Sequence, residues 1–121
     1  MGYRSDVKLA FYCENKGDNL AKLEAWVNDK LKDESEYSQR IECGSLQGIM
    51  FVWEWIKWYE DYPEIAKIIQ AMDEFGNTLA GDDFMYEFIR IGEEDNDVER
   101  QDCNTAHGLL SVRRTIELCE F

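Results

Sequence analysis

Alternating apolar and polar side chains predict several β-strands in this chain. Over residues 6–13, the residues of one parity are apolar: Val7, Leu9, Phe11 and Cys13. A period of two residues is typical of a strand that buries one face. The same alternation predicts strands over residues 84–92 and over residues 108–121.

Two other segments have helical periodicity. Residues 19–32 repeat leucine and valine every three or four positions, and Asp18 precedes them as a helix cap. A second helix is predicted from Pro63, where a missing amide costs nothing, to just before Gly76. Its apolar stripe is Ile65, Ile68, Ile69, Met72 and Phe75.

The longest predicted strand covers residues 48–59, which include three of the four tryptophans. Residues of both parities are apolar over much of its length, as in a central strand that is covered on both faces. We expect the helices to cover one face. The cover of the other face is left open by the sequence: the chain's own loops, a second copy or a foreign protein.

The predicted order is β, α, (β), β, α, β, β, where the bracketed strand is the polar segment 39–43. This order predicts a single α+β domain over residues 1–121. Its antiparallel sheet has four to five strands and two helices on one face, in a ferredoxin-like (split βαβ) arrangement with an added C-terminal strand. The acidic segment 93–108 is expected to be a loop or a ragged hairpin tip.

The aromatic sheet face is the first candidate site. It is expected to bring together Trp53, Trp55, Tyr86, Phe88, Arg90 and Arg113. Core packing is one reading, and a homodimer or partner interface is a second. A small-ligand or nucleotide site read by aromatic rings and forked guanidinium groups is a third. Ion pairing is the simplest role for Arg90, Arg113 and Arg114, with Glu87 and Glu117 as candidate partners.

Charge bears on the choice of partner. The chain has 13 basic and 26 acidic residues, a net charge of −13 and an isoelectric point near 4.4. This charge repels nucleic acid and anionic membranes and attracts basic protein surfaces, so we expect neither direct nucleic-acid nor membrane binding. The acidic candidates for partner binding are Asp82, Asp83, Glu93, Glu94, Asp95 and Asp97. Solvation of an ordinary loop is the alternative reading of these carboxylates.

Few residues suggest catalysis. His107 is the only histidine, and it lies in a polar segment with no nucleophile motif beside it. The four cysteines are scattered without metal-ligand spacing, and the acidic run is not an EF-hand loop. We therefore expect no enzyme activity, no metal and no cofactor. The absence of a signal sequence or a long apolar run predicts a cytoplasmic location.

Three segments, "GYRSDV", "KWYEDYPEI" and "FIRIGEEDNDVE", resemble a family of small, largely uncharacterised bacteriophage accessory proteins. The resemblance implies a phage-encoded protein that acts in the bacterial host cytoplasm. It also favours an inhibitor or modulator that binds a host nucleic-acid-handling or defence complex through protein–protein contacts.

Overall fold

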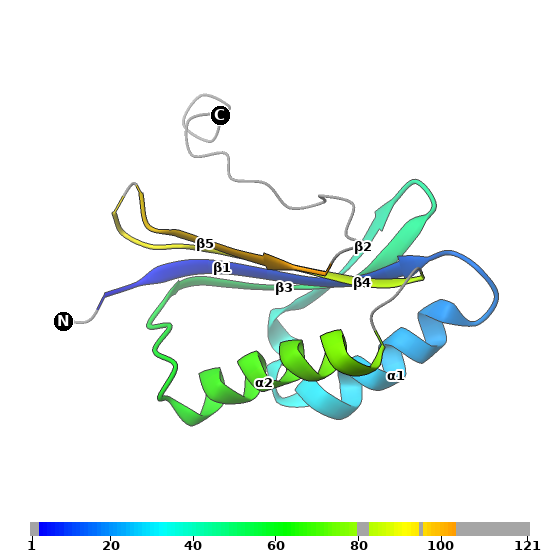
Figure 1. The fold of residues 1–121 in the computed structure, drawn as a ribbon, viewed down its shortest axis with the longest axis horizontal. Helices are drawn as coiled ribbons and strands as arrows, with labels where there is room; N and C mark the ends of the chain where they lie inside the picture. Colours follow the sequence, from blue (N-terminus) through cyan, green and yellow to red (C-terminus); the bar gives the residue numbers. More distant parts are fainter. Residues whose placement is uncertain (1–2, 80–82, 95, 104–121) are drawn as a thin grey trace.

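A computed structural model describes residues 3–79, 83–94 and 96–103 (Figure 1). Five strands, two α-helices and one 3₁₀ helix follow one another along these residues. In order they are β1 (Ser5–Glu14), α1 (Asn19–Leu31), η1 (Lys32–Tyr37), β2 (Ser38–Cys43), β3 (Leu46–Ile56), α2 (Pro63–Thr78), β4 (Phe84–Ile91) and β5 (Val98–Asp102).

The strands form one antiparallel sheet in the order β2-β3-β1-β4-β5. The short strand expected at residues 39–43 is present as β2, and it pairs with β3 at one edge. Each helix connects two strands that have one other strand between them. The α+β class and the antiparallel sheet with two helices are therefore confirmed.

Both helices cover the same face of the sheet, as Figure 1 shows. The reason is their apolar stripes, which place Leu23 and Val27 of α1 and Ile68 and Phe75 of α2 in the core. The Phe11 ring of β1 lies at the centre, 4.9 Å from the ring of Phe75. Aromatic rings thus fill the layer between the sheet and the helices, which explains why one parity of β1, β3 and β4 is so apolar.

The second face of the sheet has its own smaller buried cluster. It consists of Ala10, Tyr12, Leu46, Met85 and Ile89. Glu87 is buried among them at 1% exposure, where it accepts a hydrogen bond from the Tyr12 hydroxyl. Arg100 Nη2 lies 3.7 Å from Glu87 Oε1. The expectation of a central strand that is covered on both faces concerned residues 48–59 and is only partly right, because β3 lies second from the edge and Met50 and Val52 on its second face are half-buried. The middle strand is β1, whose residues from Leu9 to Cys13 are all buried.

Three expectations about element boundaries are wrong. The long strand ends at Ile56 instead of residue 59, because the backbone leaves the extended region at Trp55. Helix α2 continues through Gly76 to Thr78, since the φ angle of Gly76 is not positive and the helix has no left-handed glycine at its end.

The third correction is β5, which lies in the segment expected to be a loop. Its side chains are mostly exposed and polar because, in the sheet that the described residues form, it is the edge strand beside β4. A strand that is exposed to solvent on both faces lacks the alternation of apolar and polar residues by which strands are recognised in a sequence. The strand expected over residues 108–121 lies outside the described residues.

Candidate functional site

The end of β3 contains a β-bulge at Trp55. Ser5 pairs with Ile56 and Val7 pairs with Trp53, so two steps along β1 match three steps along β3. Trp55 takes up the extra residue with a φ of +55°, in the left-handed region. Its side chain is 60% exposed, although alternation places it on the same face as the buried Trp53. The bulge thus turns one tryptophan out of the core, and bulges are frequent beside functional sites.

Two side chains, one from β1 and one from the residue that precedes β1, form hydrogen bonds with the backbone of the bulge. The Trp55 amide donates to Asp6 Oδ1 at 2.8 Å, and Arg4 Nη1 donates to the Trp55 carbonyl at 3.1 Å. Both polar groups of the left-handed residue are therefore satisfied. This arrangement compensates for a conformation that is unfavourable for a tryptophan.

The N-terminal residues also bind the turn between β4 and β5. The Arg4 amide donates to Glu93 Oε2 at 2.5 Å, and the Tyr3 hydroxyl donates to Asp97 Oδ2 at 2.6 Å. The Glu94 amide donates to the Tyr3 hydroxyl at 3.1 Å. The hydrogen bond to the Asp97 carboxylate raises the pKa of the Tyr3 phenol. Residues 3–4 therefore join the acidic turn to the Trp55 bulge. We name residues 3–4, Glu93, Glu94, Asp97 and Trp55 together the N-terminal latch.

Arg90 anchors the same turn. Its guanidinium forms two parallel hydrogen bonds with Asp97, at 2.8 and 3.2 Å, and a third with Glu99 at 3.0 Å. These carboxylates, Asp97 first, raise the pKa of Arg90 further, although its partial burial acts in the opposite direction. Forked pairs of this kind fix geometry as well as charge. Ion pairing of Arg90 is thus confirmed, but with Asp97 and Glu99 in place of the expected Glu87.

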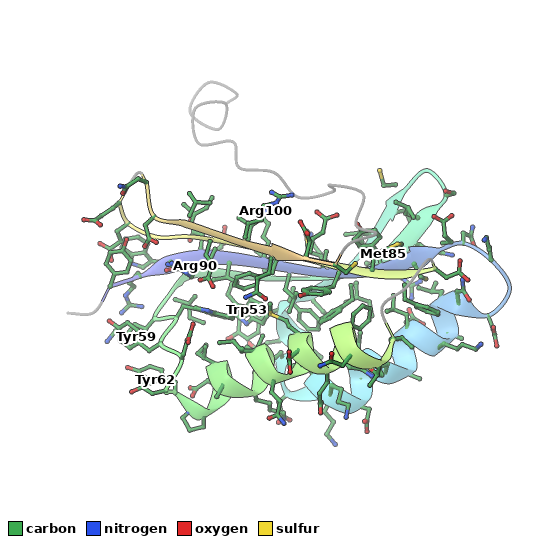
Figure 2. All side chains as sticks on the ribbon, in the orientation of Figure 1. Trp53, Tyr59, Tyr62, Met85, Arg90 and Arg100 are labelled. Atoms are coloured by element: carbon green, nitrogen blue, oxygen red, sulfur yellow. The ribbon has the colours of Figure 1, made fainter. Side chains whose placement is uncertain are left out.

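A cleft of about 350 Å³ lies between the end of β3 and the start of α2. Tyr37 forms part of its wall and packs on Trp53 with ring centroids 6.0 Å apart. The Trp53 indole N–H donates to Glu34 Oε1 at 3.2 Å. The residues that line the cleft are Arg4, Tyr37, Trp53, Glu54, Trp55, Ile56, Lys57, Tyr62, Glu64 and Ile65. Figure 2 shows Trp53 between the sheet and α2, and Tyr59 and Tyr62 at the end of the molecule where β1 begins.

The predicted aromatic face is divided by the structure. Trp53, Tyr86 and Phe88 do share one face of the sheet, but it is the face that the helices cover. Phe88 and Trp53 are each 2% exposed, so neither presents its ring on an open sheet face to a ligand or to a second copy. Trp55 is exposed at the bulge, and Arg90 is held by the acidic turn. Arg113 lies outside the described residues.

The predicted acidic surface is also divided. Glu93, Glu94 and Asp97 lie together at the latch, but Asp83 lies at the other end of the sheet, where Lys16 pairs with it at 3.4 Å. The register of β4 explains this separation, because Phe84 pairs with Cys13 at the end of β1 and Ile91 pairs with Asp6 at its start. Asp82 and Asp95 lie outside the described residues.

Sequence reasoning missed several residues of this end of the molecule. Tyr3 and Arg4 precede β1 and Asp6 lies near its start, and no spacing in the sequence relates these polar residues to Glu93 or Trp55. Tyr37 and Glu54 likewise carry no motif. The first three residues meet Trp55 and Glu93 only because the bulge in β3 and the β4–β5 turn lie on either side of the start of β1.

Among residues 3–79, 83–94 and 96–103, no group of three or more His, Cys, Asp or Glu side chains is placed to hold a metal ion. In the same described residues, neither α-helix has the length and apolar character needed to cross a membrane. Comparison of the chain with models of protein families, with curated proteins and with solved structures finds no match.

Proposed function

We propose that this chain is a non-enzymatic, acidic binding protein that meets a basic surface of a partner protein. The N-terminal latch is the contact region, with the acidic turn around Glu93 and Glu94 on one side and Trp55 on the other. In keeping with the resemblance to bacteriophage accessory proteins, the protein acts in the bacterial cytoplasm and inhibits or modulates a host nucleic-acid-handling or defence complex.

The observation that supports this proposal is the pair of contacts made by Arg4. Its amide binds Glu93 and its guanidinium binds the Trp55 carbonyl, so one residue joins the two features. Tryptophan is enriched in binding hot spots, and Trp55 is exposed. The carboxylates of the acidic turn complement a basic surface. Long-range attraction by a net charge of −13 would speed the encounter with a basic surface.

The alternative function, a small-ligand or nucleotide module on the aromatic and arginine sheet face, has less support. Such a module needs accessible rings and a guanidinium with unoccupied donors. Phe88 is buried, and Arg90 already donates from Nε to Glu99, from Nη1 to Ser5 and from Nη2 to Asp97. A homodimer that uses the same face meets the same difficulty with Trp53 and Phe88.

The strand order supports a finer proposal about the fold. The order of β1 to β4, with each helix connecting strands that flank a third, is that of the split βαβ arrangement. We therefore assign the first four strands and two helices to a ferredoxin-like unit, to which β5 is added at the β4 edge.

The test is a pull-down from bacterial lysate with the protein as bait at low and at high salt. The double variant Glu93→Gln/Glu94→Gln removes two charges at the latch. The control Glu42→Gln/Asp73→Asn removes two exposed charges elsewhere, one of them beside the β2–β3 turn at the opposite end of β3. We expect salt-sensitive capture of a partner that falls in the latch variant and persists in the control. Equal capture by both variants would overturn the proposal.

A further inference from the structure

Trp55 combines three properties that are unusual in one residue. It is a large aromatic side chain, it is 60% exposed, and its φ of +55° is one that glycine adopts most readily. Among the non-glycine residues that the structure describes, it is the only one with a positive φ. Neither burial nor backbone preference accounts for a tryptophan here. Strained residues of this kind are concentrated at ligand-binding sites.

The bulge places Trp55 on the wall of the cleft described above. Tyr37, 42% exposed, and Tyr62 add aromatic surface to the same cleft. Aromatic faces attract cations, and a planar guanidinium also stacks on them. The cleft volume of about 350 Å³ is at the lower end of the range for ligand pockets, which suits one long side chain better than a whole cofactor.

The charges around the cleft favour a cation. Exposed carboxylates of Glu54 and Glu64 line it, and Glu60 and Asp61 lie between them in the chain. Lys57 and Arg4 also line the cleft, so the charges of its lining side chains balance. The excess of negative charge comes from the exposed Glu60 and Asp61 and from the net charge of −13 of the chain.

We propose that the cleft beside Trp55 binds an arginine side chain from a basic, extended segment of the partner protein. The guanidinium stacks on the Trp55 ring and pairs with the Glu54 carboxylate, and the acidic turn meets the neighbouring basic residues of the segment. This inference rests on the proposed function and adds the side chain that is recognised. It also gives a role to the one tryptophan that the fold turns outward.

The test uses a model ligand, the capped tripeptide acetyl-Gly-Arg-Gly-amide at millimolar concentration. The matched ligand replaces arginine by citrulline, which has nearly the same shape and no charge. The indole N–H resonances of the tryptophans are followed by NMR as peptide is added. Trp26 is the internal control, because it packs between Phe11 and Phe75 on the helix side of the sheet, away from the cleft.

We expect a saturable shift of the Trp55 indole with the arginine peptide, no shift of Trp26, and at most a weak response to citrulline. Trp55→Leu and Glu54→Gln should each weaken binding about three- to tenfold. The control Glu42→Gln removes an exposed charge beside the β2–β3 turn and should leave affinity unchanged. Glu54 is exposed, so its variant keeps the test valid if Trp55→Leu is poorly folded.

An unshifted Trp55 resonance, equal binding of the citrulline peptide, or equal weakening by Glu42→Gln and Glu54→Gln would each overturn the arginine site. Failure of the arginine site can be distinguished from failure of the proposed function. If Glu93→Gln/Glu94→Gln loses the captured partner while Trp55→Leu retains it, the acidic contact is supported and the arginine site is wrong.

Discussion

Replacing Trp55 by alanine and by glycine measures the backbone strain at the bulge, because both substitutions remove the same ring. At a φ of +55° a residue with a Cβ atom is disfavoured by about 1–2 kcal/mol. Glycine avoids that penalty but loses about 0.5–1 kcal/mol through the greater freedom of its unfolded chain. We therefore expect Trp55→Gly to be more stable than Trp55→Ala by about 1 kcal/mol. With a urea m-value of about 2 kcal/mol/M, the unfolding midpoints should differ by about 0.5 M.

Glu54 provides the matched control for this pair. It precedes Trp55 in the same strand, its side chain is exposed and its φ is not positive. There the usual order should hold, with Glu54→Ala more stable than Glu54→Gly by about 0.5–1 kcal/mol. Far-UV circular dichroism follows all four unfolding curves without relying on tryptophan emission. If Trp55→Ala equals or exceeds Trp55→Gly in stability, the left-handed conformation and the argument from strain are refuted.

Three further predictions concern the scaffold. Gly48→Ala should lower the free energy of unfolding by about 1–3 kcal/mol, since its Cβ would lie 2.1 Å from a backbone oxygen of β1. Gly76→Ala should raise it by about 0.5–1 kcal/mol, because this position is helical and its Cβ would make only an ordinary contact, 3.9 Å from the Tyr86 ring. Equal urea midpoints for the two variants would contradict the register. Burial raises the pKa of Cys13 to about 11, so the folded state retains a proton that the unfolded state loses above its ordinary value of 9.0. The free energy of unfolding should therefore fall between pH 9 and 11. At pH 8 a thiol reagent should modify the exposed Cys43 long before the buried Cys13. Reaction of both thiols at the same rate would refute the burial of Cys13. Arg90→Gln should lower the free energy of unfolding by about 2 kcal/mol or more, because it leaves the carboxylates of Asp97 and Glu99 unpaired. An unchanged urea midpoint would mean that these ion pairs contribute nothing to stability.

Much of the fold follows from the spacing of apolar residues. The apolar stripes of α1 and α2 and the alternation in β1 and β4 predict these elements. Two-sided burial was expected for residues 48–59, but the strand that shows it is β1, in the middle of the sheet. β5 could not be predicted in this way, because an edge strand that is exposed on both faces has no reason to alternate. The end of α2 was predicted too early, because a glycine such as Gly76 can end a helix but does not have to.

The site was predicted less well because it depends on one local departure from regularity. Alternation puts Trp53 and Trp55 on the same face, and only the extra residue of the bulge separates them. No feature of the sequence marks a tryptophan that adopts a positive φ. The approach of Tyr3 and Arg4 to the acidic turn likewise depends on the order of strands in the sheet, which sequence patterns do not encode directly.

The most direct test of the central claim is to map where a basic segment binds. Amide resonances of isotopically labelled protein are recorded by NMR while an arginine–glycine repeat peptide is added at moderate salt. The account predicts that the largest shifts lie in residues 3–6, 54–57 and 93–94, with residues 44–45 at the opposite end of β3 unchanged. Shifts that are spread evenly over the exposed carboxylates, or that are largest at the β2–β3 turn, would contradict it.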